Sequence, residues 1–210
     1  MRYVWDPFVR ICHWSLVAAF TVAFVTHASE WDRVTHTKAG YVAGTLIISR
    51  IIWGFLKTGY ARFQSFPPDP EAALRYTWRT VRGRARPFVG HNPAGSLVIY
   101  AMLVLGLSTV ISGFLVFNDG WLLDFSDVLH DVHFYSAWGW LILVCGHVIG
   151  VITESVLHKE NLILAMFTGM KYDVEKSVKP KDNKLVSRET IRIFAIFTLP
   201  FKWLYKWFCR

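Results

Sequence analysis

The chain has 210 residues, of which 53% are hydrophobic and 18% charged, and its formal net charge is +8. This hydrophobic fraction is high for a soluble domain and ordinary for a small bundle of membrane helices. The sequence contains no P-loop, no G-x-G-x-x-G after a strand, no H-E-x-x-H and no G-x-S-x-G, so it carries none of the marks of the common nucleotide-binding, zinc-protease and serine-hydrolase classes.

Four segments are predicted to cross a membrane, which takes about 20 mostly apolar residues. The first begins at Pro7, because Asp6 is a good helix cap and proline is favoured at the first helical position. A signal peptide is the alternative for this segment, but the run is long and lacks a convincing cleavage site. The four spans are about Pro7–Ala28, His36–Leu56, Gly95–Phe117 and Val132–Val156, the last with Ser126 or Asp127 as a cap a little earlier.

The charges of the connecting segments predict the orientation. Lysine and arginine are frequent between residues 57 and 86 and again between 159 and 184, whereas residues 118–131 contain four aspartates and neither lysine nor arginine. Positive charge marks the cytoplasmic side, so we expect both termini inside and a chain that runs out, in, out and in. The basic residues are then topology signals near anionic lipid, and we expect no nucleic-acid partner.

Residues 176–210 do not continue the four-span pattern. Pro200, Lys202 and Lys206 interrupt an apolar, aromatic stretch whose remaining large side chains share one face. Such a pattern favours a helix lying in the inner interface over a fifth span. We therefore expect an all-α integral membrane fold, with a four-helix transmembrane bundle in residues 1–175 and a cytoplasmic-side tail with a membrane-surface helix in residues 176–210.

Four histidines fall into two layers of the predicted bundle. His133 and His147 are 14 positions apart on the fourth span, which puts them about 21 Å apart and nearly on the same face of a helix. His13 enters the first span from the inside and is level with His147, whereas His36 opens the second span on the outside and is level with His133. The up-and-down order therefore predicts the pairs His13/His147 and His36/His133.

Facing histidines without a cysteine or carboxylate at the same level suit the two axial positions of a haem iron. The three cysteines form no C-x-x-C-H attachment motif, so such haems are expected to be b-type and non-covalent. We therefore expect two haem b groups, with His13, His36, His133 and His147 as iron ligands. His27, His91, His130 and His158 are expected to be solvated or hydrogen-bonded histidines near the membrane surface.

Three further residues of the second span are candidates for haem contact. Gly40 and Gly44 follow His36 at i+4 and i+8, leaving a bare face for a flat macrocycle or, equally, for small-residue helix packing. Arg50 lies on the same face at the inner layer, where a haem propionate would supply the anion that a membrane arginine needs. The alternative is that the long side chain of Arg50 extends toward the inner membrane surface, so that its guanidinium reaches water or lipid headgroups.

Several motifs together resemble a known family. The stretches are WDPFVRICHW, THTKAGYVAGTLIISRIIWG, GHNPAG and HKENLILAMFTGMK, and they cover about residues 3–172. They resemble the bacterial di-haem cytochrome b561 family, which is grouped with the cytochrome b subunits of nickel-iron hydrogenases. The resemblance implies an electron-transfer cytochrome between the quinone pool and a partner at the outer face, and its haem ligands fall on the same four histidines.

The leading hypothesis is therefore an electron carrier that serves quinone and a periplasmic redox protein, such as a basic c-type cytochrome attracted by the aspartates of residues 118–131. A superoxide:quinone oxidoreductase acting at the outer haem is the alternative, but its anionic substrate would favour positive charge there. A non-redox anchor is the third hypothesis. GHNPAG and the arginine-rich loop could shape an inner quinone pocket, and a plain cytoplasmic loop is an equally good interpretation of them. Whether the protein is an enzyme in its own right is left open.

Overall fold

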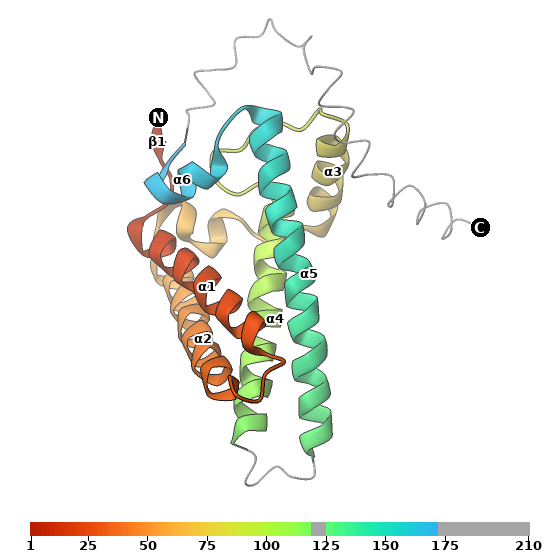
Figure 1. Ribbon diagram of the computed structural model, residues 1–210. Helices are drawn as coiled ribbons and strands as arrows, with labels where there is room; N and C mark the ends of the chain where they lie inside the picture. Colours follow the sequence, from red (N-terminus) through yellow and green to blue (C-terminus); the bar gives the residue numbers. More distant parts are fainter. Residues whose placement is uncertain (119–124, 172–210) are drawn as a thin grey trace, which may run out of the picture.

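The computed structural model describes residues 1–118 and 125–171 and contains a bundle of long helices with short elements at one end (Figure 1). Four of the described helices, α1, α2, α4 and α5, are long and apolar enough to cross a membrane, which confirms the predicted all-α membrane class. The tail helix expected in residues 176–210 lies outside the described residues. The elements are β1 (Arg2–Tyr3), α1 (Pro7–Thr26), α2 (Arg33–Leu56), η1 (Gly59–Ala61), η2 (Phe63–Ser65), α3 (Pro70–Val81), α4 (Pro93–Phe117), α5 (Ser126–His158), α6 (Leu162–Thr168) and β2 (Met170–Lys171).

Asp6 begins α1 as the sequence predicts. Its Oδ1 accepts a hydrogen bond from the Val9 backbone N–H at 3.0 Å, and its Oδ2 accepts one from Trp53 Nε1 on α2 at 3.2 Å. The predicted span lies within α5, but the predicted cap was wrong, because the helix begins at Ser126 with Phe125 as its cap residue and no side-chain cap bond. Asp127 instead lies in the first turn, where its carboxylate interacts favourably with the helix dipole.

The long helices form two antiparallel hairpins, α1–α2 and α4–α5, and α2 packs against α4. Figure 1 shows the short elements α3 and α6 and the N-terminus together at one end of the bundle, which we call the α3 end. At the other end α1 turns into α2 and α4 leads toward α5, and we call this the hairpin end. The arrangement places α1, α2 and α5 around a shared centre.

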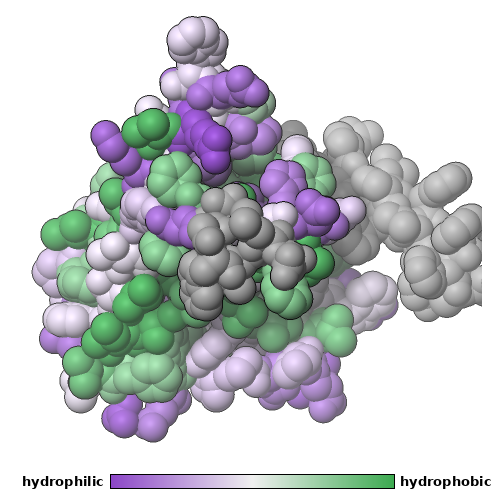
Figure 2. All heavy atoms as spheres, turned by 90° about the horizontal axis from the view of Figure 1, so that it is seen from below, coloured by the Kyte–Doolittle hydropathy of each residue, from purple (hydrophilic) through white to green (hydrophobic). Residues whose placement is uncertain are grey.

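The centre of the bundle is packed from small and large side chains in alternation. Ile47 is fully buried, and Ala43 and Trp140 are nearly so. A Cβ at Gly106 on α4 would lie 2.9 Å from both Ile47 Cδ1 and Trp140 Cζ2, so only glycine allows α4 to approach this closely. The flanks of the bundle carry large exposed apolar side chains such as Ile48, Ile52 and Val104, as expected of surface that faces lipid. Figure 2 looks at the molecule from the hairpin end and shows hydrophobic side chains beside hydrophilic ones in this view.

A buried polar cluster joins α3 to α5 at the α3 end. Tyr76 Oη donates to the carboxylate of Glu154 at 2.9 Å, and His158 Nε2 lies 3.2 Å from the same carboxylate. Burial, followed by the negative charge of Glu154, raises the pKa of Tyr76, which therefore stays a protonated donor. The amphipathic α3 is thereby fastened to the end of a transmembrane helix.

The two short strands hold α6 against the start of the chain. β1 and β2 pair antiparallel, with Tyr3 opposite Met170, and the backbone N–H of Val4 donates to Gly169 O at 2.8 Å. Gly169 ends α6 with φ +82°, and a Cβ there would lie 2.7 Å from Trp5 O. Glycine is therefore required for this turn, which brings α6 beside the first turns of α1.

Candidate cofactor site

The structure brings His36 and His133 together near the hairpin end. His36 lies one turn inside α2 and His133 two turns inside α5, and their ring centres are 6.1 Å apart with the planes at 78°. Both side chains are half-buried. The two imidazoles therefore face each other across the bundle from different hairpins.

Backbone carbonyls fix the orientation of both rings. His36 Nδ1 lies 2.8 Å from Ala23 O on α1, and His133 Nδ1 lies 2.9 Å from Thr109 O on α4. A carbonyl oxygen only accepts hydrogen bonds, so each Nδ1 must carry the proton and donate it. Each Nε2 is then the unprotonated nitrogen, which is the form that binds a metal.

The second pair, His13 and His147, lies nearer the α3 end. Their ring centres are 6.4 Å apart with the planes at 60°, and both side chains are half-buried. His13 Nδ1 is buried and has no hydrogen-bond partner among the described residues. A buried, unpartnered imidazole nitrogen is unfavourable in an apolar bundle unless a ligand satisfies it.

These separations fit one metal atom between the rings of each pair. Two metal–nitrogen bonds of about 2 Å each account for roughly 4 Å of the distance between the ring centres. The remainder corresponds to the two short distances from a ring nitrogen to its own ring centre. Groups of three or more His, Cys, Asp and Glu that could hold a metal do not occur in the described part of the chain. Opposed pairs without further protein ligands suit the two axial positions of a haem.

The glycines near the pairs differ in what surrounds them. A Cβ at Gly40 would have no neighbouring atom within 4 Å, so space is open beside it, whereas a Cβ at Gly44 would lie 2.6 Å from Val110 Cγ1. Gly44 thus makes the close helix contact that was the alternative interpretation. A third glycine, Gly113 on α4, was not singled out from the sequence. A Cβ there would lie 2.8 Å from both Cε1 and Nδ1 of His133.

Arg50 lies at the α3 end of α2, and only part of its guanidinium is hydrogen-bonded to described residues. Arg50 Nη2 donates to Ala61 O at 3.3 Å, its Cζ lies 5.1 Å from the centre of the Phe63 ring, and Nη1 is buried without a partner among the described residues. Arg50 therefore does not extend freely to water, and one N–H group remains available for an anion.

His91 is the residue that the sequence interpretation placed wrongly. Instead of being a solvated loop histidine, it packs its ring 4.1 Å from that of Phe66 and 4.7 Å from that of Trp5, and its Nδ1 is buried without a partner in the described ranges. The pKa of His91 falls to about 3, chiefly because burial penalises the charged ring and further because Arg50 lies close by. His91 precedes the α4 cap residue Asn92, a position that commonly packs inward.

The remaining histidines agree with the expectation for surface positions. His27 is exposed and its Nδ1 contacts Phe24 O, His130 is exposed, and His158 pairs with Glu154. His130 was considered as a substitute for His133, but the ring facing His36 is that of His133. The four histidines of the two pairs are therefore the ones that face one another.

Four apolar helices, two opposed imidazole pairs and the absence of a haem-attachment motif define the class of membrane cytochromes that bind haem b. The sequence comparison agrees with this class, because the family profile described as prokaryotic cytochrome b561 matches residues 4–169. The chain belongs to the prokaryotic cytochrome b561 family, which confirms the resemblance seen in its motifs. It is accordingly a haem-binding membrane protein of electron transfer.

Several relatives share about a quarter of their residues with the chain. A probable Ni/Fe-hydrogenase B-type cytochrome subunit of Bradyrhizobium diazoefficiens is 23% identical over 80% of this chain and 84% of the relative. The corresponding protein of Azotobacter vinelandii is 23% identical over 80% and 88%. The probable hydrogenase 1 B-type cytochrome subunit of Escherichia coli K12 is 23% identical over 81% and 90%. No solved structure gives a significant match.

Proposed function

We propose that the chain carries electrons across a bacterial inner membrane by means of two b haems, between the quinone pool and a redox partner at the hairpin end. The observation that carries this proposal is the presence of two separate imidazole pairs, with ring centres 6.1 and 6.4 Å apart. The two residues on α5, His133 and His147, are about 21 Å apart along the helix, which covers much of an apolar layer about 30 Å thick.

His36 and His133 hold one haem in this proposal, and His13 and His147 hold the other. Haem iron supplies one-electron chemistry, because it alternates between the ferric and ferrous states. The protein contributes neutral imidazoles in a fixed orientation, since the Nδ1–H groups of His36 and His133 donate to backbone carbonyls. Neutral ligands held on rigid helices require little rearrangement when the iron changes charge.

Arg50 and His91 are proposed to bind the propionates of the haem at the α3 end. Arg50 Nη1 and His91 Nδ1 are both buried without a partner among the described residues, and the pKa of His91 responds to the positive charge of Arg50 and to His147. An anion between them would satisfy both groups. Gly40 is proposed to leave room for a macrocycle edge, and the contact of Gly44 with Val110 supports only a packing role.

The α3 end is proposed to face the cytoplasm. Described segments at this end are rich in arginine and lysine, whereas Asp127 and Asp131 are exposed near the hairpin end. Positive residues remain on the cytoplasmic side during insertion, so both chain ends would lie inside the cell. Residues 176–210 would then be a cytoplasmic-side tail, with its apolar face on the membrane surface.

The partner at the hairpin end is proposed to be a redox protein in the periplasm. The names of the relatives point to a nickel-iron hydrogenase as one such partner, and the exposed Asp127 and Asp131 favour a basic c-type cytochrome as another. Both are served by the same position of the His36/His133 pair. The exposed acidic residues give no support to an anionic substrate such as superoxide, so that reaction is not proposed.

The test is the haem content of the purified protein and of four ligand variants. The wild type should contain about two haems per chain, extractable by acid acetone because no thioether bond holds them. His13→Ala and His147→Ala should each lose the same redox potential, and His36→Ala and His133→Ala should each lose the other. Retention of one potential in every variant is the internal control for folding. One haem per chain, or matching effects of His13→Ala and His36→Ala, would contradict the proposal.

A further inference from the structure

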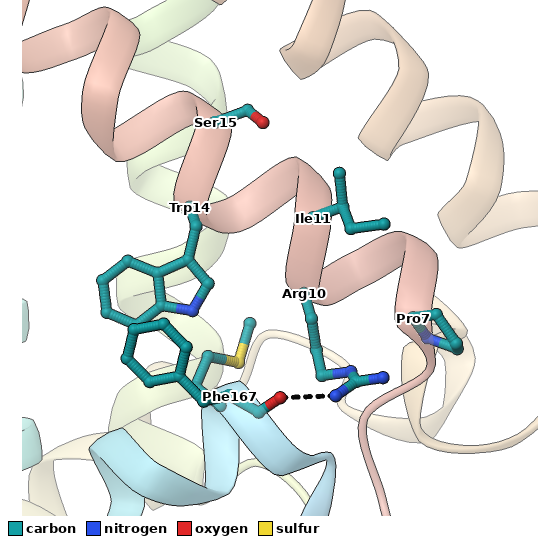
Figure 3. Close-up of a pocket in the computed structure, with 7 residues that line it drawn as sticks. Pro7, Arg10, Ile11, Trp14, Ser15 and Phe167 are labelled. Carbon is teal, nitrogen blue, oxygen red and sulfur yellow. Dashed lines mark hydrogen bonds between the residues drawn. The ribbon is translucent and has the colours of Figure 1, made fainter.

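A cavity of about 400 Å³ lies at the α3 end between the first turns of α1 and the short helix α6. Figure 3 shows Arg10 and Trp14 projecting from α1 toward Phe167, and Ile11 and Ser15 of the same helix also line the cavity. The indole of Trp14 stacks on Phe167 with ring centres 4.2 Å apart, and the guanidinium of Arg10 donates to Phe167 O. The lining is otherwise mostly apolar, with Pro7, Ile11 and Met166.

Two N–H donors at this cavity have no acceptor in the part of the chain that the structure describes. Arg10 Nε and Trp14 Nε1 are buried, and neither has a hydrogen-bond partner among the described residues. Tryptophan and arginine near a membrane surface are often simple interface anchors, but anchors direct their N–H groups to water and lipid headgroups. Here both nitrogen atoms are shielded from solvent, which is unfavourable unless a ligand with acceptor oxygens satisfies them.

We infer that this cavity binds the ring of a membrane quinone, with Arg10 and Trp14 donating to a quinone carbonyl and Phe167 and Met166 contacting the ring. A quinone has carbonyl acceptors and no donors, so it complements a site that offers N–H groups and apolar walls. The exposed Ile11 and Leu164 provide an apolar path for the isoprenoid tail into the lipid. This inference rests on the proposed function and specifies its quinone site.

The position suits electron exchange with the His13/His147 pair. Trp14 follows His13 in the chain, and the centres of their rings are 5.1 Å apart. Oxidation of one quinol to quinone releases two electrons and two protons. The electrons would pass one at a time to the haems that the two histidine pairs would hold, and the protons would leave to water at the α3 end. Arg10 is three residues after the start of α1, about 5 Å along the axis, so the cavity adjoins the aqueous boundary.

An anionic lipid headgroup is the competing occupant of a site with an arginine at the membrane surface. A phosphate would favour the outer nitrogen atoms of Arg10, but one of these, Nη1, already donates to Phe167 O. The second free donor belongs to Trp14, one turn deeper in α1, which a neutral ring can reach more readily than a charged headgroup. The observations therefore favour the quinone.

The experiment measures reduction of the haems by decyl-ubiquinol in the full-length holoprotein, reconstituted in vesicles of neutral phosphatidylcholine. Met166→Trp should fill the cavity and raise the KM for the quinol at least about tenfold. Trp14→Phe keeps the stacked ring and removes one donor, so its KM should rise about threefold to tenfold. Ile163→Trp, on α6 but outside the cavity lining, is the matched control and should leave KM unchanged. The haem spectrum and both potentials should stay at wild-type values in all three variants.

Each outcome decides a separate question. Wild-type reduction with raised KM in Met166→Trp and Trp14→Phe supports the site. Wild-type reduction with unchanged KM in both variants overturns the site and leaves the proposed function standing. No reduction of the wild type by any quinol tested overturns both. Effects of the variants that occur only when anionic phosphatidylglycerol replaces phosphatidylcholine would assign the cavity to a lipid headgroup and overturn the quinone site.

Discussion

The replacement Gly113→Ala directly perturbs the His36/His133 pair. The added methyl group would lie 2.8 Å from both Cε1 and Nδ1 of His133, too close for van der Waals contact. The ring would have to move as a whole, because both atoms lie on the same side of it. Its Nδ1 would then move away from Thr109 O, the carbonyl 2.9 Å away that fixes its orientation. We expect haem to bind more weakly at the His36/His133 pair and with unchanged affinity at the His13/His147 pair.

The magnitude follows from the cost of overpacking. Inserting a methyl group into a packed helix interface costs about 1–3 kcal/mol. If this cost falls on the cofactor-bound state, haem affinity at the hairpin end drops roughly 5-fold to 140-fold, at 1.4 kcal/mol per factor of ten. Alanine is the better helix former, so the helix itself would not account for a loss. The His13/His147 pair should keep its affinity, because His147 lies about 21 Å from His133 along α5.

The assay is a haem titration of the purified variant together with a redox titration that resolves two potentials. Gly146→Ala is the matched control, because Gly146 is exposed on α5 and a Cβ there would have no neighbour within 4 Å. It should bind haem like the wild type. The reasoning would be refuted if Gly113→Ala held both haems with unchanged affinities and potentials, or if it lost the haem at the α3 end instead.

Three further changes test other parts of the structure. Arg50→Leu should lower the potential of the α3-end haem, because it removes a positive charge that favours the reduced state; a shift confined to the hairpin-end haem would contradict this placement. Tyr76→Phe leaves the buried Glu154 one donor short and should lower stability by about 1–3 kcal/mol in a thermal melt of the detergent-solubilised protein, whereas Tyr135→Phe at an exposed position should not. Asp127→Asn should slow electron transfer to a basic c-type cytochrome at low salt and flatten its salt dependence; equal rates at every ionic strength would remove Asp127 from the docking surface.

The spans could be predicted because the apolar layer of a membrane imposes a length and a composition. The start of α1 was also predictable, since Asp6 and Pro7 form a local signal that does not depend on the rest of the fold. The cap of α5 was predicted one or two residues too late, at Ser126 or Asp127 instead of Phe125, and the membrane span was predicted to begin at about Val132 within this longer helix. Apolar composition reports the depth of a residue in the membrane, whereas the helix itself continues into water until its backbone hydrogen bonds end.

The sequence predicts which histidines lie at the same level of the bundle, but not the other groups that contact them. The level of a residue in the bundle follows from its distance along each helix, so the pairs His13/His147 and His36/His133 could be expected. The carbonyl of Thr109, the close approach of Gly113 and the inward packing of His91 depend on how helices and loops pack in three dimensions. The sequence left open whether GHNPAG and the arginine-rich loop form a quinone pocket or a plain loop. The cavity between α1 and α6 could not be foreseen, because it depends on how α6 packs beside the start of the chain.

Each imidazole pair takes one residue from the α1–α2 hairpin and the other from α5. Between the two hairpins the protein itself offers mainly the packing of α2 on α4 and aromatic contacts such as that of Phe20 with Trp140. Two iron atoms bound in this way would crosslink the α1–α2 hairpin to the α4–α5 hairpin. Each hairpin can enter the bilayer alone with its backbone satisfied, and cofactor delivery then becomes the assembly step that joins them. Shortage of haem would thus leave loosely associated hairpins exposed to membrane proteases, so that the amount of mature protein follows the supply of its cofactor.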